Sequence, residues 1–159
     1  IITVFMLSLS VGYLLGGRLS MNNPNLMIFG SFFALAAIAL LPTIAYGDFL
    51  MESVFSRVTD PRYGSLLVSG LMFFLPTAIL GMIAPYSVRL LVANEQHSGK
   101  IAGTLYFVST LGSAIGTLGT SFYLVLWFEI NQILVTLASV LFAGGVIAYL
   151  GHHRLEANS

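Results

Sequence analysis

Cysteine is absent from this 159-residue chain, so the chain forms no disulfide, holds no metal through thiolates and has no cysteine nucleophile. Charge is also scarce, because Asp, Glu, Lys and Arg make up 8% of the residues, against roughly 25% in soluble domains. The formal net charge of +0 gives no reason to expect nucleic acid or an acidic partner. Hydrophobic residues account for 57% of the chain. This composition predicts an all-α, polytopic integral membrane protein.

The familiar catalytic motifs are missing as well. The sequence has no GxSxG, no phosphate-binding lysine loop, no HExxH and no dinucleotide-binding GxGxxG. Its apolar segments contain almost no acids or bases from which an active site could be built. We therefore expect that this chain alone is not an enzyme and that it binds no cofactor or metal.

The first residues, IITVFMLSLSVGYLLGG at 1–17, lack both a starting Met and a basic segment. They do not have the form of a signal peptide. We expect instead a membrane helix that the sequence enters partway.

Five segments are long and apolar enough to cross a bilayer, which takes roughly 20 helical residues. They form one expected transmembrane domain over 1–159 and run at about 1–17, 26–46, 63–91, 101–128 and 131–150. Between them, the polar stretch at 47–62 mixes apolar residues with Asp48, Glu52 and Arg57. Two interpretations fit that stretch equally well, a short helix lying in the membrane interface and an ordinary ordered loop.

The basic residues predict an orientation. In a five-helix arrangement, Arg18, Arg89, Lys100 and Arg154 fall on one side of the membrane, and Arg57 and Arg62 fall on the other. The side richer in Lys and Arg is expected to be cytoplasmic. This places the carboxyl terminus in the cytoplasm.

Small residues dominate the segment at 101–128, which has no charged residue. Residues four apart share a helix face, so the small residues form two adjacent rows, Ser109, Ser113, Thr117 and Ser121 beside Gly112, Gly116 and Thr120. Such faces let helices approach closely and exchange hydrogen bonds in lipid. We predict a helix-packing face here. The alternative is the lining of a substrate path, which the lack of charge weakens.

Two prolines interrupt the segment at 63–91. Pro76 and Pro85 each remove a backbone donor, so we expect the helix to bend or open locally, with freed carbonyls bonded by Thr77, Tyr86 or a neighbouring helix. Transporters use broken helices as binding sites, although most such features are only kinks. The candidate broken-helix site comprises Pro76, Thr77, Gly81, Pro85, Tyr86 and Arg89.

The remaining polar residues have simpler interpretations. Arg89 is expected to mark the cytoplasmic helix end, with its guanidinium reaching the headgroups. Glu129 lies at a tight turn and is expected to be solvated. His152 and His153 are helix neighbours that point about 100° apart, a poor arrangement for a shared metal.

Two stretches, PTAILGMIAPYSVRLL and GKIAGTLYFVSTLGSAIGTLGTSFYLV, resemble the membrane portion of bacterial fused MFS/spermidine-synthase-like proteins. The matching positions are Pro76, Gly81, Pro85 and Arg89, followed by Gly99, Ala102, Gly103, Leu105, Tyr106, Thr110, Gly112, Ser113, Gly116 and Thr117. VGYLLGGRLS is similar to that family's second helix and the corner that follows it. The resemblance covers most of the chain and is strongest at 76–122.

The chain departs from this family in two ways. The family's cytoplasmic aminopropyltransferase-like domain is absent, so its activity does not carry over to these residues. The resemblance also implies six helices, with the family's first helix missing here, where the hydropathy pattern predicts five.

Three functions stay open from the sequence. The first is a non-catalytic subunit or anchor of the bacterial inner membrane that packs against the bilayer and against other membrane subunits or further copies of itself. The second is a transporter-like module for a polyamine-related or other small solute, although the acidic residues Asp48, Glu52, Asp60, Glu95 and Glu129 all fall in loops or at helix ends. The third is the membrane fragment of a fused aminopropyltransferase-like enzyme.

Overall fold

The computed structural model describes residues 1–92 and 98–157, with side chains described through residue 153. Regular structure in these ranges is helical: α1 (Ile2–Leu19), α2 (Leu26–Phe55), α3 (Pro61–Leu91), α4 (Ser98–Gly119), the π-helix η2 (Thr120–Leu124), α5 (Val125–Trp127) and α6 (Ile130–Ala157). α4, η2 and α5 follow one another as a single rod. Five helices, counting this rod as one, are long and apolar enough to cross a membrane. The predicted all-helical class and the five spans are confirmed.

The stretch at 47–62 is neither a separate interfacial helix nor a loop throughout. α2 runs on to Phe55, and a turn at residues 56–60 connects it to α3. Asp60 caps α3, because its Oδ1 accepts a hydrogen bond of 2.9 Å from the backbone N–H of Arg62, and Pro61 occupies the first helical turn. The loop interpretation was wrong for residues 47–55 and is confirmed only for the turn at 56–60. A separate short helix was also wrong, because residues 47–55 continue α2.

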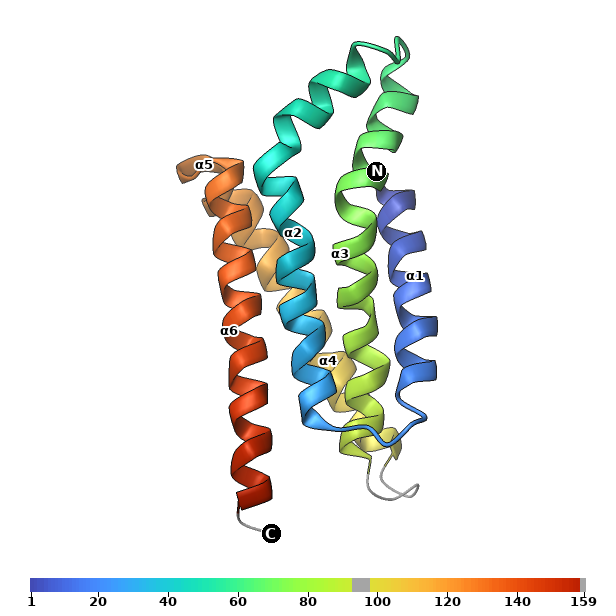
Figure 1. Cartoon of the computed structure of the whole chain (residues 1–159), viewed down its shortest axis with the longest axis vertical. Coiled ribbons are helices and arrows are strands. Elements are labelled where there is room, and N and C mark those ends of the chain that lie inside the picture. Colours follow the sequence, from blue (N-terminus) through green and yellow to red (C-terminus); the bar gives the residue numbers. More distant parts are fainter. Residues whose placement is uncertain (93–97, 158–159) are drawn as a thin grey trace.

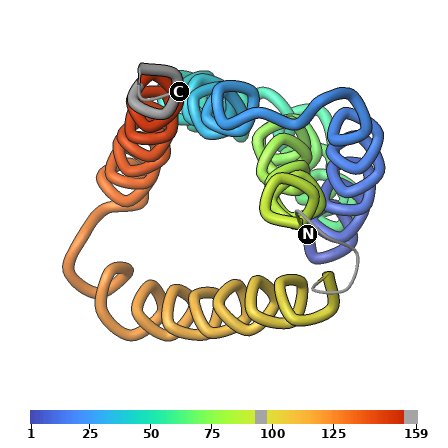
Figure 2. The backbone as a smooth tube through the Cα atoms, turned by 90° about the horizontal axis from the view of Figure 1, so that it is seen from below, coloured from blue at the N-terminus to red at the C-terminus, as the bar shows by residue number. Residues whose placement is uncertain are grey.

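Four helices stand in a row, and the fifth stands apart. α1 packs on α3, α3 on α2, and α2 on α6, so the order in space is α1, α3, α2, α6 (Figures 1 and 2). The rod of α4, η2 and α5 crosses behind α2 at an angle (Figure 1). Viewed along the bundle, it bridges the two ends of the row (Figure 2). None of the residues in the most apolar part of this rod is buried.

α1 and α3 touch through glycine. Gly12 and Gly16 lie one turn apart on α1 and are buried. A Cβ added at Gly12 would lie against the carbonyl oxygen of Ala78, and one added at Gly16 would lie 2.5 Å from that of Met82. On the α3 side, a Cβ at Gly81 would lie 3.2 Å from the Cα of Gly12. The two backbones are therefore in direct contact, which is the packing that small residues permit in lipid.

α2 and α6 form the other close contact. A Cβ added at Gly145 would lie 3.0 Å from the carbonyl oxygen of Gly30. Further along the same pair of helices, a buried cluster joins them, with Ala36, Ala37 and Leu40 from α2 and Ala138 and Leu141 from α6. A buried apolar cluster thus joins α2 to α6.

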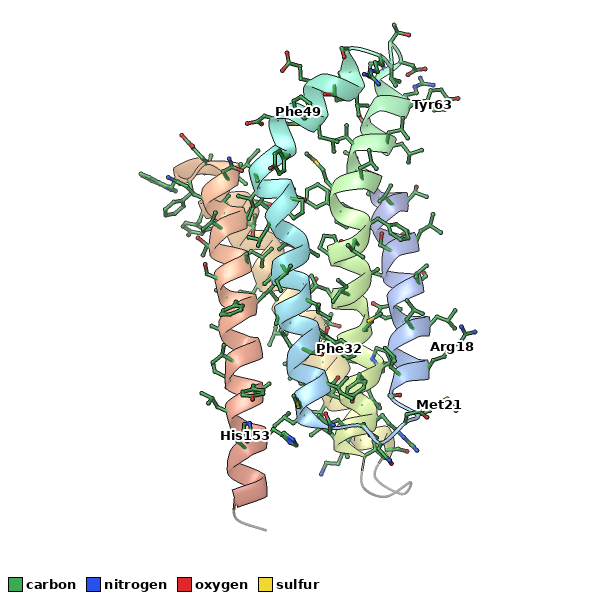
Figure 3. The ribbon with its side chains drawn as sticks, viewed as in Figure 1. Arg18, Met21, Phe32, Phe49, Tyr63 and His153 are labelled. Atoms are coloured by element: carbon green, nitrogen blue, oxygen red, sulfur yellow. The ribbon has the colours of Figure 1, made fainter. Side chains whose placement is uncertain are left out.

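The described basic side chains separate as the charge count predicted, and the side chain of Arg154 lies outside the described residues. Arg18, Arg89 and Lys100 lie at the end of the bundle where α1 and α3 finish and α4 starts, and all three are exposed. Arg57 and Arg62 lie at the opposite end. In Figure 3, Arg18 and Met21 mark the lower end and Tyr63 the upper end, and Arg18 points away from the bundle.

Candidate functional site

The predicted broken-helix segment is a continuous helix. α3 runs without interruption from Pro61 to Leu91, with Pro76 and Pro85 inside it, so the expected local opening does not occur. Pro76, Gly81 and Tyr86 are buried, Thr77 and Pro85 are half-buried, and Arg89 is exposed near the helix end. α3 offers no unwound backbone with which to hold a solute. The reason is that each proline removes one donor, and the rest of the helix keeps its own hydrogen bonds.

A neighbouring helix bonds the carbonyl that Pro76 frees. In an unbroken helix, the N–H of residue 76 would donate to the carbonyl of Met72, four residues earlier. Proline has no N–H, and the hydroxyl of Thr43 on α2 donates to that oxygen instead, at 3.0 Å and in a buried position. This is one of the partners expected from the sequence, although Thr43 itself could not be identified there.

Tyr86 is the largest fully buried side chain, with an exposed fraction of 0%. Its hydroxyl accepts a hydrogen bond of 3.0 Å from the backbone N–H of Asn25 and donates one of 3.4 Å to the Asn25 carbonyl. Its ring stacks on Phe29 and meets Phe32 edge-on, with centroids 6.3 and 5.1 Å away. Tyr86 therefore does not serve a freed carbonyl within α3. It holds the start of α2 against the end of α3.

Asn25 was not singled out from the sequence, yet it both caps α2 and connects α2 to Tyr86 of α3. Its side-chain oxygen accepts a hydrogen bond of 2.7 Å from the Ile28 N–H and so caps α2, while its backbone binds Tyr86. The sequence pattern that could have indicated this helix cap is NNPN at residues 22–25, in which Asn25 directly precedes an apolar run. In the structure, Asn23 of the same stretch has a positive φ of 45°.

The predicted packing face has no partner within the described residues. Most of its members are exposed on α4 and η2, and Thr120 alone is half-buried: Ser109, Gly112, Ser113, Gly116, Thr117, Thr120 and Ser121. A Cβ added at Gly112, Gly116 or Gly119 would find nothing within 4 Å. The end of this face lies in the π-helix at Thr120–Leu124, a widened turn that sequence patterns did not predict and that often occurs at functional positions.

Most serine and threonine hydroxyls of this rod make no hydrogen bond among the described residues. Helical Ser and Thr commonly bond a carbonyl one turn back, as Ser8 does to Val4 at 2.6 Å and Thr104 to Lys100 at 2.9 Å. In the part of the chain that the structure describes, six hydroxyls on α4 and η2 make no hydrogen bond: Ser109, Thr110, Ser113, Thr117, Thr120 and Ser121. At membrane depth no water replaces the missing partners.

A cavity of about 400 Å³ lies where α1, α3 and the lower half of α4 come together, beside Phe29 of α2. Apolar side chains form most of its wall, including Leu80, Ile83 and Leu105. Four residues that carry a hydroxyl also line it, and they come from three helices: Tyr13, Ser87, Tyr106 and Ser109. The predicted packing face borders this cavity at Ser109, and it borders a second cavity at Thr120, whose wall includes Gln132 and Thr136 of α6.

No arrangement for a metal is found among the described side chains, because nowhere do three or more His, Asp or Glu come together. His152 and His153 have ring centroids 6.1 Å apart, and the ring of His153 lies edge-on to that of Tyr149 at 4.8 Å. Glu129 is exposed at its turn, and its N–H donates 3.3 Å to the side chain of Gln132, which caps α6. Glu95 lies outside the described residues.

No known protein-family model, curated protein or solved structure matches this chain.

Proposed function

We propose that this chain is a non-catalytic subunit of the bacterial inner membrane that packs in a larger complex through the small-residue face of α4, with its carboxyl terminus in the cytoplasm. In this role it is equivalent to the membrane half of the spermidine-synthase-like fusion proteins that its sequence resembles. The bilayer and other membrane subunits, or further copies of the chain, are its partners.

The observation that carries the proposal is the isolation of the α4 rod. A span of 30 residues, Ser98–Trp127, has no buried residue in its most apolar part, although its face combines open glycines with hydroxyls that have no partner. Lipid chains fill such a groove poorly and accept no hydrogen bond. A helix from another subunit supplies both the fit and the hydrogen bonds.

The non-catalytic part of the proposal is supported by the acidic and basic residues. Asp48, Glu52, Asp60 and Glu129 are exposed near the upper end of the bundle, and Arg18 and Arg89 are exposed at the lower end. They form no shared cluster within the described residues. A carrier of polyamines would need carboxylates along its path, so the transporter-like function has no observation in its favour.

The test is a comparison of glycine variants. Gly112→Leu and Gly116→Leu place a bulky side chain in the groove. Gly103→Leu adds the same side chain nine residues from Gly112 and thirteen from Gly116, which is about 180° and 140° around α4 from them. All three positions are open in the structure. Co-purification in mild detergent should show loss of a stoichiometric partner in the first two variants only.

The proposal fails if wild type and all variants purify as the same monomer, or if the Gly103 variant loses its partner equally. Measurement of the intact mass of the purified protein tests the hypothesis that this chain is a fragment of a longer fused enzyme. A mass near the 17.1 kDa of this sequence contradicts a longer fused enzyme, and a mass of twice that or more supports one.

A further inference from the structure

The cavity between α1, α3 and α4 has the size of a ligand site. Its volume of about 400 Å³ falls in the range of roughly 300–1,000 Å³ that small-molecule sites occupy. Its wall is mainly apolar, with aromatic rings from Phe29, Tyr13 and Tyr106. A hydrophobic wall with a few polar groups is the usual composition of such sites.

Three of the four hydroxyl-bearing residues of the cavity wall have no hydrogen-bond partner within the described part of the chain. The hydroxyls of Tyr13, Tyr106 and Ser109 make no hydrogen bond with any described residue. Ser87 differs, because its hydroxyl donates 2.8 Å to the carbonyl of Ala84. Three donors from two helices therefore belong to residues that line a mainly apolar cavity and are themselves exposed, Tyr13 at 49% and Tyr106 at 62%. A hydroxyl without a partner in apolar surroundings favours an occupant that accepts hydrogen bonds.

The charge of the occupant is also constrained. The cavity wall contains no charged residue. Arg18 and Arg89 each lie nine residues along the helix from a wall residue, Leu9 and Leu80, which puts them on the opposite faces of α1 and α3. They cannot neutralise an anionic group in the cavity. An occupant without charge is the one that fits.

The depth of Ser109, the donor farthest along its helix from the lower end of the bundle, distinguishes two sources of neutral carbonyls. Ser109 lies 11 residues from the start of α4 at Ser98, which is about 16 Å of helix and about half of a 30 Å hydrocarbon layer. Phospholipid ester carbonyls stay near the interface and do not reach that depth. A carbonyl-bearing ring with an apolar tail can enter the layer entirely.

From these observations we propose that the cavity binds a quinone, that is, a flat neutral ring with two carbonyl acceptors and an apolar chain. The ring lies among Phe29, Tyr13 and Tyr106, and its carbonyls accept hydrogen bonds from Tyr106 and Ser109 on α4 or from Tyr13 on α1. A bound quinone would also hold α4 to the bundle, since the cavity lies at its contact with α3. This proposal shares Ser109 with the packing face, but it does not involve Gly112 or Gly116.

The experiment measures thermal unfolding of the full chain in detergent while 2-decyl-1,4-benzoquinone is titrated by mole fraction in the micelle. Because a ligand that binds the folded state raises the unfolding temperature, we expect a saturable rise. Decylbenzene has the same tail and a ring without carbonyls, and it should give no saturable rise.

Variants locate the site. Ala84→Phe fills the cavity from α3 and should abolish the saturable rise, while Ala45→Phe, at an exposed position on α2, should keep it. Tyr13→Phe and Tyr106→Phe each remove one donor and should weaken binding about 5- to 10-fold, as expected for a single hydrogen bond. Tyr46→Phe, at another exposed tyrosine, is the matched control and should bind as wild type does.

Two results would overturn the proposal. One is equal stabilisation by decylbenzene and the quinone, which would mean that the cavity only takes up hydrocarbon. The other is that Tyr13→Phe and Tyr106→Phe both bind the quinone as wild type does. This second measurement does not depend on whether Ala84→Phe folds. Loss of a protein partner in the Gly112 and Gly116 variants with unchanged quinone binding would show that the two sites are separate.

Discussion

The hydroxyl of Thr43 bonds the carbonyl oxygen of Met72 at 3.0 Å, the one oxygen that Pro76 deprives of its partner within α3. The α2–α3 interface therefore contains a specific replacement for a missing backbone hydrogen bond. This explains how α3 keeps a proline in its buried middle without opening.

Thr43→Val should destabilise the fold by about 0.5–2 kcal/mol, because it leaves the Met72 carbonyl unsatisfied in an apolar environment. Thr43→Ser keeps the hydroxyl and should cost less. The measurement is reversible unfolding in mixed micelles. A double-mutant cycle tests the cause: in a Pro76→Ala background residue 76 regains its N–H, so the effect of Thr43→Val should shrink. An unchanged effect in that background would contradict our explanation.

Gly12→Ala should separate α1 from α3. The added Cβ would meet the Ala78 carbonyl oxygen and lie 2.9 Å from the Cα of Gly81, and relief requires the backbones to move. We expect a loss of about 1–3 kcal/mol in the free energy of unfolding, as for other overpacked contacts. Gly17→Ala is the control, since nothing lies within 4 Å of its added Cβ. Equal stability of the two variants would mean that the α1–α3 contact is looser than described.

Tyr86→Phe should retain the ring contacts with Phe29 and Phe32 and remove both hydrogen bonds to Asn25. The Asn25 N–H is left without its partner, so we expect a loss of about 1–2 kcal/mol. Proteolysis of the connection at residues 20–25 should accelerate in parallel, because that connection is held by Tyr86. Tyr63→Phe, at a tyrosine that is 64% exposed, should have neither effect.

The orientation can be tested cleanly because the chain has no cysteine. Single cysteines at Met21 and Tyr63 lie at opposite ends of the bundle (Figure 3), and both residues are well exposed, at 75% and 64%. In intact cells, a membrane-impermeant maleimide should label the Tyr63→Cys variant at once and the Met21→Cys variant only after permeabilisation. The opposite pattern would reverse the predicted topology.

Hydropathy alone located all five spans, because the length of a membrane helix follows from bilayer thickness. The end of α2 was missed by nine residues, from 46 to Phe55. Polar residues such as Asp48 and Glu52 mark the end of the apolar segment, and we therefore predicted that the helix ends there. The helix continues beyond the apolar segment to Phe55. The hydrophobic pattern shows which part of a helix lies in an apolar environment, and it does not show at which residue the helix ends.

The packing partners were much harder to predict. The spacing argument that selected Gly112 and Gly116 applies equally to Ser8, Gly12 and Gly16, and within the described residues only the α1 row is buried against another helix. Small residues four apart predict that a face can be approached closely, and they do not say by what. Tyr86 and Asn25 are 61 positions apart in sequence, so no local pattern could have paired them.

The pairing of α2 with α6 has a consequence for how the protein is made. Helices enter the membrane in chain order, so α1, α2 and α3 can associate while synthesis continues. The surface of α2 around Gly30 and Leu40 must then wait until α6, the last helix of this sequence, emerges. In the later part of that interval α4 has also entered the membrane nearby without being its partner. Insertion factors that shield a half-finished bundle would therefore be needed most between the synthesis of α3 and that of α6.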